Sequence, residues 1–554
     1  MTIPAPRPAP ADAAGPDTPH GTPHGTLRSP GEQHDLASFG YDQQLRRGVG
    51  SFASFAAGFS FVSILTTVFQ LFGLGFSFGG AGFFWTWPAV FAGQLLVALC
   101  FAELAARYPI SGAIFQWSSR LAGTDVGWFT GWVMVIGQIL TVATAAIALQ
   151  AVLPAVWSGF QLVGGASADS APTSATGAQN AVVLGIALLV VTTTISIIGV
   201  RLMAMLTSVA VVIEILGVVA LVVALTTAAE RSVTVVASTE GAAPGTYLPL
   251  WLASSLMAAY VMVGFDSAGE LSEETHAPRR TTPRTILSAL VLSGIGGLLL
   301  IVAGLMAAPS LTDGTLVSGG LAGVLTARLG DVGGRILLLA VAVAVFACTL
   351  AIQTAGSRMI FSMARERALP FSGVLGAVSP RTGTPVATSV VVGVGAAIAL
   401  AVNWNQSAVF TALASLCIAM LYLAYLGVTL PLLITRVRQA RAPRPGLDAV
   451  GFEAGRTDET GSPLFSLGRR GIAVNALAVA FQIGMIVNLA WPRPGIYDLT
   501  GETWWLQWSA LLFITATLVV GALVHWRNRV RHGGVIVLGS VTRPAPQAAE
   551  VGAP

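Results

Sequence analysis

Two acidic side chains, Asp266 and Glu270, lie inside a long apolar run, in the segment VGFDSAGE at positions 263–270. A carboxylate at mid-membrane costs at least ~2.5–3.5 kcal/mol, so an acid kept there has a function or a polar partner. Gly264 and Gly269 flank Asp266 and lower the local helix propensity by roughly 1 kcal/mol each. The segment predicts a helix interrupted within the membrane, where freed backbone amides and carbonyls can hold a polar solute.

A similar interruption is predicted in the first apolar run, where residues 58–63 read GFSFVS. Interrupted helices that lie five helices apart are typical of transporters built from two inverted halves, with the substrate at their interface. The alternative is that these glycines only allow close packing between helices. For residues 58–63 both interpretations stay open, whereas Asp266 favours a functional break in the later segment.

Other polar residues in apolar runs are candidates for different roles. Glu214 could bind and release a proton, join a cation site, or pair with a polar neighbour as a structural residue. Asp266 and Glu270 are the other candidates for ion coupling. Glu103 and Arg107 lie one helical turn apart near a predicted inner helix end, which favours a structural or gating ion pair over a substrate contact.

The composition shows what kind of scaffold must position these residues. The chain of 554 residues is 54% hydrophobic and 10% charged, whereas soluble proteins average roughly 25% charged residues. The net charge of +4 comes from 29 arginines and no lysine. These arginines form short clusters between apolar runs, which is typical of membrane-flanking charge and argues against nucleic-acid binding. The three cysteines lie in apolar runs without metal-ligand spacing, so we expect neither a metal nor a cofactor.

From Phe52 onward, apolar runs long enough to cross ~30 Å of hydrocarbon follow one another. Each must be helical, because lipid offers the backbone no other hydrogen-bond partner. Continuous runs of this length also differ from the short alternating strands of a membrane barrel. The predicted spans are 53–74, 82–106, 125–153, 180–200, 203–227, 248–272, 285–307, 333–362, 385–402, 408–434, 472–490 and 504–526.

The arginines also predict the orientation. If the N-terminal tail is cytoplasmic, 25 of the 29 arginines lie on the inner side or at inner helix ends. This agreement with the positive-inside rule favours an even number of spans in the plasma membrane, with both termini cytoplasmic. The four exceptions are Arg231, Arg328, Arg335 and Arg493.

The expected fold is all-α and polytopic, with about twelve spans arranged as ten plus two. Residues 1–44 are rich in Pro, Ala, Gly and Thr and are expected to form a disordered cytoplasmic tail without a signal peptide. The remaining segments are a first five-helix repeat (45–227), a second (228–434), a solvated cytoplasmic linker (435–471), two additional helices (472–526) and a cytoplasmic tail (527–554).

Four stretches of the chain carry a resemblance to a known family. They read FSFVSILT at 59–66, ELA with YP and SG over 103–112, GFD, LSEE, PRR and P over 264–283, and SRM, MAR, ALP and GTP over 357–385. In this order the chain resembles the amino acid–polyamine–organocation permeases, in particular their amino acid/choline branch, which includes gamma-aminobutyrate permeases. The match covers roughly residues 50–435, and the ordered set is far more specific than any one stretch.

The resemblance implies a leucine-transporter-like fold of two inverted five-helix repeats and two extra helices. It also implies alternating access around a site between spans 1 and 6, with contributions from spans 3, 8 and 10. The backbone at 61–63 would receive a substrate carboxylate, the backbone at 264–266 an ammonium group, and Phe265 would cover the substrate. The implied substrate site comprises Ser60, Phe61, Val62, Ser63, Gly264, Phe265, Asp266 and Ser267.

Two departures from the family pattern bear on mechanism. Some relatives use a lysine in span 5 as a fixed or titrating charge, whereas the nearest candidate in this chain is Glu214. Several members of the branch carry a neutral or histidine side chain where this chain has Glu270. The extra acidity favours a cationic or zwitterionic solute.

The sequence predicts a secondary transporter of amino acids, gamma-aminobutyrate or related amines, coupled to protons or working by exchange within the lipid bilayer. A membrane-embedded enzyme would need a nucleophile–base pair or metal ligands at membrane depth, and none converge in the apolar runs. A transporter-derived sensor is the other alternative, although no signalling domain is attached.

Gln138 lies inside an apolar run. Its side chain either forms hydrogen bonds between helices or lines the substrate site.

Overall fold

The computed structural model describes residues 36, 39–171, 174–312, 314–404, 409–497 and 504–532. Within them the chain forms helices and a few isolated bridges but no β-strand. The protein is therefore an all-α polytopic membrane protein, as the composition predicts. The α-helices are α2 (Ser51–Val62), α3 (Ile64–Gly79), α4 (Thr86–Arg107), α5 (Ala113–Ala122), α6 (Thr124–Val156), α7 (Ala175–Ile198), α8 (Val200–Thr227), α9 (Tyr247–Val261), α10 (Ser267–Glu270), α11 (Pro278–Ala307), α12 (Thr315–Arg365), α13 (Ser372–Leu375), α14 (Val386–Ala401), α15 (Val409–Arg441), α16 (Gly471–Ala490), α17 (Pro494–Tyr497) and α18 (Ser509–His532). Short 3₁₀ segments are Gly80–Trp85, Ser158–Phe160, Val233–Ala237, Ser272–Glu274, Val402–Trp404, Gly468–Arg470 and Trp504–Trp508.

Nine helical stretches of the described chain are long and apolar enough to cross a membrane. One of them, Ser51–Arg107, contains two of the predicted spans. Two other predicted spans coincide with the shorter helices Tyr247–Val261 and Val386–Ala401. The number of twelve crossings is compatible with these segments but stays a prediction, because the length of the short helices alone does not decide that they cross.

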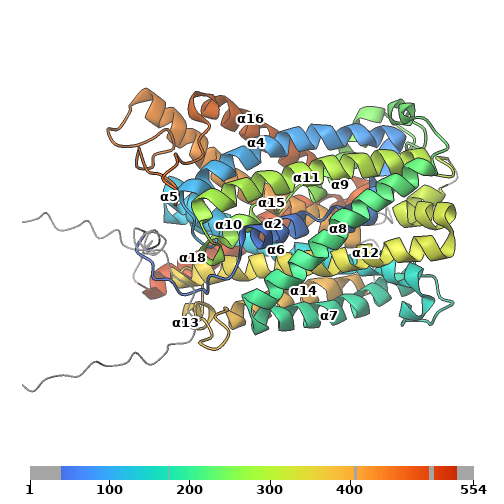
Figure 1. Ribbon diagram of the computed structural model, residues 1–554, viewed down its shortest axis with the longest axis horizontal. Helices are drawn as coiled ribbons and strands as arrows, with labels where there is room; N and C mark the ends of the chain where they lie inside the picture. Colours follow the sequence, from blue (N-terminus) through green and yellow to red (C-terminus); the bar gives the residue numbers. More distant parts are fainter. Residues whose placement is uncertain are drawn as a thin grey trace, which may run out of the picture.

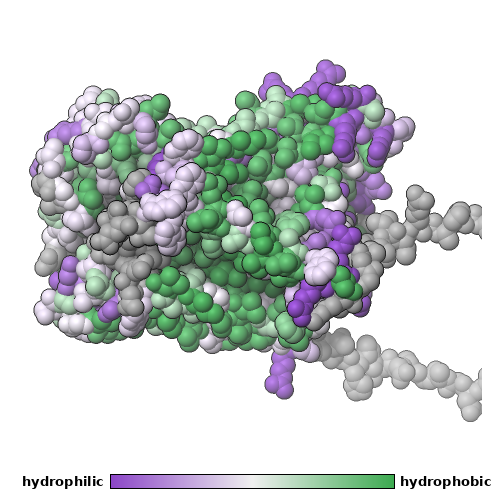
Figure 2. Space-filling view, turned by 180° about the vertical axis from the view of Figure 1, so that it is seen from behind, coloured by the Kyte–Doolittle hydropathy of each residue, from purple (hydrophilic) through white to green (hydrophobic). Residues whose placement is uncertain are grey.

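The long helices run along the long axis of the molecule, and α8 crosses one face of the bundle obliquely (Figure 1). Seen from behind, an apolar band covers the middle of the molecule between two hydrophilic ends (Figure 2). Large apolar side chains such as Val190, Leu216 and Ile398 point outward and are 62%, 64% and 65% exposed. An apolar surface of this extent is what a bilayer, rather than water, stabilises.

Both predicted helix interruptions are confirmed. The first apolar span is two helices, because α2 ends at Val62 and α3 begins at Ile64, with Ser63 between them at φ +32°. The predicted span over 248–272 is interrupted after α9, and residues 262–266 are non-helical before the short α10. A Cβ at Gly58 would lie 3.5 Å from Thr285 and 3.6 Å from Ala289 of α11, which are ordinary contact distances. The packing of α2 against α11 therefore does not require glycine at position 58.

The helix groups follow the predicted segments with some differences. Helices α2–α8 lie within 45–227, α9–α14 within 228–434, and α16 and α18 over most of 472–526, whereas α15 continues past residue 434 to Arg441. An inverted symmetry between the two five-helix groups stays a prediction. The predicted tails lie mostly outside the described residues, at 1–35, 37–38 and 533–554.

Some residues of the predicted tail and of the predicted linker are buried, which differs from the prediction. Phe39 and Tyr41, assigned to a disordered tail, are 5% and 7% exposed and pack against the end of the helix bundle. Val450 and Phe452, assigned to a solvated linker, are 1% and 7% exposed. Burial against the rest of the protein stabilises the apolar side chains of both segments, and a Pro- and Gly-rich composition does not reveal this.

Candidate functional site

The two helix interruptions touch one another at the centre of the bundle. Gly264 has φ +94°, a conformation that side chains rarely adopt. A Cβ at this position would lie 1.7 Å from Cδ1 of Phe61, the second-last residue of α2. Glycine is therefore required at 264 for two reasons, the backbone conformation and the approach of the Phe61 ring. The contact brings the two predicted substrate-binding segments together.

Tyr425 of α15 joins the second interruption to the rest of the bundle. Its hydroxyl accepts a hydrogen bond of 2.8 Å from the backbone N–H of Gly264 and donates one to the carboxylate of Asp266. Phe265, between Gly264 and Asp266 in the sequence, is fully buried. The centre of its ring lies 5.5 Å from that of Tyr425 and 5.9 Å from that of Phe101. Tyr425 is not among the residues that the sequence predicts for the site, because in sequence it is only a polar-tipped aromatic residue in an apolar run.

The second acid, Glu270, lies on α10 and is also buried. Nε2 of Gln138, on α6, donates a hydrogen bond of 2.8 Å to Oε1 of Glu270. The other carboxylate oxygens, Oδ2 of Asp266 and Oε2 of Glu270, have no hydrogen-bond partner among the described residues. Leaving a buried acceptor unpaired costs about 1–3 kcal/mol, so such oxygens are suited to a ligand that donates hydrogen bonds.

Several other buried hydroxyls also lack a hydrogen-bond partner within the described chain. Ser60 and Ser267 belong to the predicted substrate site, whereas Tyr260 and Thr354 were not predicted. None of the four hydroxyls has a hydrogen-bond partner in the part of the chain that the structure describes. Val62 is buried and apolar, so its contribution to a polar site can come only from its backbone. The described residues contain no group of three or more His, Cys, Asp or Glu arranged to hold a metal ion.

Glu214 of α8 contacts the first interruption directly. Its Oε1 accepts a hydrogen bond of 2.9 Å from the hydroxyl of Ser63 and one of 3.2 Å from the backbone N–H of Leu65. The Ser63 hydroxyl also lies 2.7 Å from that of Thr66. The carboxylate thus caps the N-terminus of α3, where a negative charge is favoured by the helix dipole. Among the predicted ion-coupling residues, Glu214 lies at the first interruption and Asp266 and Glu270 at the second.

Glu103 and Arg107 lie apart from this centre, at one end of α4. Nη2 of Arg107 lies 3.3 Å from Oε1 of Glu103, and Arg436 of α15 also pairs with Glu103. The segment after α15 closes the cluster, since Asp448 accepts a hydrogen bond of 2.7 Å from Nε of Arg107. The Ser466 hydroxyl donates one of 3.0 Å to Glu103. The predicted pair is therefore part of a larger ionic cluster that ties the linker to α4 and α15.

The N-terminal segment reaches the same end of the bundle. The Tyr41 hydroxyl donates a hydrogen bond to the carboxylate of Glu366, and the guanidinium of Arg365 lies 4.2 Å from the centre of the Tyr41 ring. Burial, together with the nearby Glu366 carboxylate, raises the pKa of Tyr41 to about 12. The phenol therefore stays protonated at neutral pH and remains a hydrogen-bond donor.

Comparison with known proteins agrees with this architecture. The model of the amino acid permease family matches residues 49–520. The amino-acid permease BAT1 of Arabidopsis thaliana is 28% identical to the chain over 520 residues, which cover 90% of this chain and 94% of the relative. A BAT1 homolog of Oryza sativa subsp. japonica is 27% identical, with 84% and 89% covered. The methylthioribose transporter of Bacillus subtilis is 24% identical over 54% of this chain and 63% of its own length. With its family model matching most of the chain and its helices arranged as a polytopic membrane bundle, this protein belongs to the amino acid permease family, whose members carry solutes across membranes.

Proposed function

We propose that the protein is a secondary active transporter of amino acids, gamma-aminobutyrate or related amines, working by alternating access in the plasma membrane with both termini cytoplasmic. The observation that carries the proposal is the buried cluster at the two helix interruptions, where Asp266 and Glu270 each keep one carboxylate oxygen without a partner in the described chain. An ammonium group donates the hydrogen bonds that these oxygens lack and offsets their charge. The N–H of Ser63 bonds to the carbonyl of Phe59, so the complementary donors for a carboxylate are the first-turn backbone N–H groups of α3.

The acids favour an amine-bearing substrate over a neutral or anionic one. Two buried carboxylates near one another are costly, so a positively charged group between them binds in part by relieving that cost. A zwitterionic amino acid places its ammonium at residues 264–270 and its carboxylate at the N-terminal end of α3. This assignment of the substrate's two ends follows the charges and the broken helices together.

Proton coupling is assigned to Glu214 in this proposal. Its carboxylate bonds to Ser63 and Leu65, so a change in its protonation alters the capping of α3 next to the substrate segment. Transport is then coupled to protons because protonation of Glu214 shifts the population from a state in which a carboxylate caps α3 to one in which a neutral acid caps it. Exchange of one substrate for another uses the same site without a net proton movement.

The proposal is tested by uptake of a radiolabelled panel of amino acids, gamma-aminobutyrate and polyamines into proteoliposomes, with and without an inward proton gradient. We expect saturable uptake of at least one amine-bearing substrate and loss of that uptake in Asp266→Asn. The matched control is Asp42→Asn, which removes one exposed carboxylate outside the helices. Flat uptake across the panel, or equal uptake and binding in Asp266→Asn and the unaltered protein, would contradict the proposal.

A further inference from the structure

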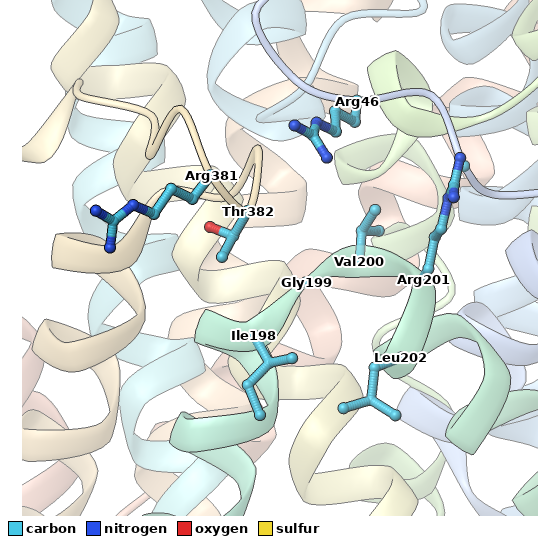
Figure 3. Close-up of a pocket in the computed structure, with 9 residues that line it drawn as sticks. Arg46, Ile198, Gly199, Val200, Arg201, Leu202, Arg381 and Thr382 are labelled. Atoms are coloured by element: carbon cyan, nitrogen blue, oxygen red, sulfur yellow. The ribbon is translucent and has the colours of Figure 1, made fainter. Parts of the chain in front are cut away.

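A pocket of about 260 Å³ lies away from the central site, where the N-terminal segment meets the junction of α7 and α8 and the loop before α14. Figure 3 shows its lining in close-up. The residues that line it are Arg46, Gly48, Ile198, Gly199, Val200, Arg201, Leu202, Arg381 and Thr382. No acidic residue is among them, so the pocket is cationic.

The three arginines come from three separate segments of the chain. Arg46 precedes α2, Arg201 is the second residue of α8, and Arg381 lies in the loop before α14. Within the described residues, neither Arg201 nor Arg381 has a hydrogen-bond or ion-pair partner, and Arg46 donates only to the carbonyl of Pro380, at 3.3 Å. The guanidinium groups are therefore available to an anion.

Two glycines set the positions of two of these arginines. A Cβ at Gly383, where φ is +68°, would lie 2.6 Å from Cγ of Arg46. A Cβ at Gly48 would lie 3.4 Å from Cγ of Arg201. The stems of both arginines pack over backbone that has no side chain, although both residues are exposed overall.

The same pocket receives the N-terminus of α8. This helix runs for 28 residues, its N-cap is Gly199, and no side chain caps it. Its first backbone N–H groups are unpaired within the helix and carry a partial positive charge, which favours an anion. Arginines and amide donors together form the donor set that a phosphate group accepts from.

The other end of the pocket is apolar and points along the helices. Figure 3 shows Ile198 of α7 and Leu202 of α8 on the side opposite Arg46, where the two helices continue into the bundle. Ile198 is 53% exposed, and the outward residues Met205 and Val209 farther along α8 are each 56% exposed. In a membrane protein this apolar stripe faces acyl chains, so the pocket offers a charged end and a lipid-facing end in one place.

We propose that this pocket binds the phosphate of an anionic phospholipid from the adjacent leaflet, with the acyl chains lying along Ile198 and the outer face of α8. Free phosphate would satisfy the arginines but would leave the apolar end unused, which is why the lipid is the better match. The proposal depends on the membrane location of the helices and not on which solute the central site carries.

The test uses the full-length protein in detergent, titrated with dioleoyl phosphatidylglycerol or phosphatidylcholine and followed by native mass spectrometry and thermal unfolding. We expect saturable binding of phosphatidylglycerol and a rise in melting temperature that phosphatidylcholine does not give. In the double variant Arg201→Gln/Arg381→Gln the affinity for phosphatidylglycerol should fall about tenfold, because charge-assisted hydrogen bonds are lost. Arg201→Lys/Arg381→Lys should restore part of it.

The matched control is Arg469→Gln/Arg470→Gln, which removes two exposed arginines from the segment before α16. If this control weakens phosphatidylglycerol binding as much as the pocket variant, the attraction is nonspecific and the proposal is wrong. If inorganic phosphate or glycerol phosphate displaces the lipid at equal concentration, the pocket is a site for free anions, and the lipid assignment is overturned. Equal melting temperatures of all variants in phosphatidylcholine show that their folds are intact.

Discussion

The ring of Phe61 occupies the space that a side chain at position 264 would need, so the first helix interruption packs directly against the second. These residues are about two hundred positions apart in the chain. Phe61 lies in the last turn of α2, next to the first interruption, and Gly264 lies in the non-helical segment 262–266. Such a contact is suited to a protein in which two helix groups move relative to one another around a bound solute.

Gly264→Ala is predicted to abolish uptake and lower the stability of the protein. The new Cβ would collide with Phe61 at 1.7 Å, and alanine disfavours φ +94°. Overpacking of this kind costs about 1–3 kcal/mol, to which the backbone strain adds. Uptake into proteoliposomes and thermal unfolding in detergent measure the two effects. Gly58→Ala is the control, because its Cβ would meet neighbours only at ordinary contact distances of 3.5 Å or more, and uptake should be kept there.

Tyr425→Phe is predicted to weaken substrate binding while keeping the fold. The hydroxyl connects the N–H of Gly264 to the Asp266 carboxylate, so its loss frees both ends of the second interruption. We expect KM to rise about tenfold, as for the loss of a hydrogen bond to a charged group. The comparison is Tyr422→Phe, one turn earlier on α15, whose ring packs toward Phe481. A KM that rises equally in both variants would show a general effect of hydroxyl loss and argue against a role for Tyr425.

The sequence predicted the helical class and both interruptions, because apolar run length and glycine placement are local signals. It could not predict the contact between Phe61 and Gly264 or the hydrogen bonds of Tyr425, since these depend on how distant helices pack. The buried Phe39 and Val450 were assigned to solvated segments for the same reason. Composition describes what a segment can bury by itself, whereas both residues are buried against helices formed elsewhere in the chain.

Glu214→Gln is predicted to remove the stimulation of uptake by an inward proton gradient and to leave substrate binding in place. A glutamine carbonyl can still accept the hydrogen bonds from Ser63 and Leu65, so the cap of α3 persists while the titrating group is gone. Uptake with and without the gradient, together with equilibrium substrate binding, separates the two effects. Glu240→Gln changes an exposed acid outside the membrane spans and should leave the gradient response intact. A persistent response in Glu214→Gln would assign coupling to another group.

Asp448→Asn is predicted to release the linker from the helix bundle. The carboxylate of Asp448, in the linker, pairs with Nε of Arg107, whose side chain is only 4% exposed. The variant therefore leaves a buried guanidinium with fewer hydrogen-bond acceptors. The amide oxygen of asparagine can keep the local turn, in which Oδ1 accepts from the N–H groups of Val450 and Phe452 at 3.0 Å. The change therefore acts on the docking of the linker rather than on its own conformation.

The readout is limited digestion with trypsin, because Arg441 and Arg456 are cleavage sites at the start and in the middle of this segment, whereas Arg444 precedes a proline and resists cleavage. The chain has no lysine to complicate the pattern. If cleavage tracks the population of the undocked linker, the loss of this ion pair should accelerate it about tenfold. Glu453→Gln breaks a neighbouring pair with Arg456 in which the side chains are 69% and 31% exposed, and such surface pairs contribute little. Cleavage as slow in Asp448→Asn as in Glu453→Gln would mean that Glu103 and Arg436 hold the linker without Asp448. Faster cleavage at an unchanged melting temperature would instead identify a linker that can leave the end of α4 while the bundle stays folded.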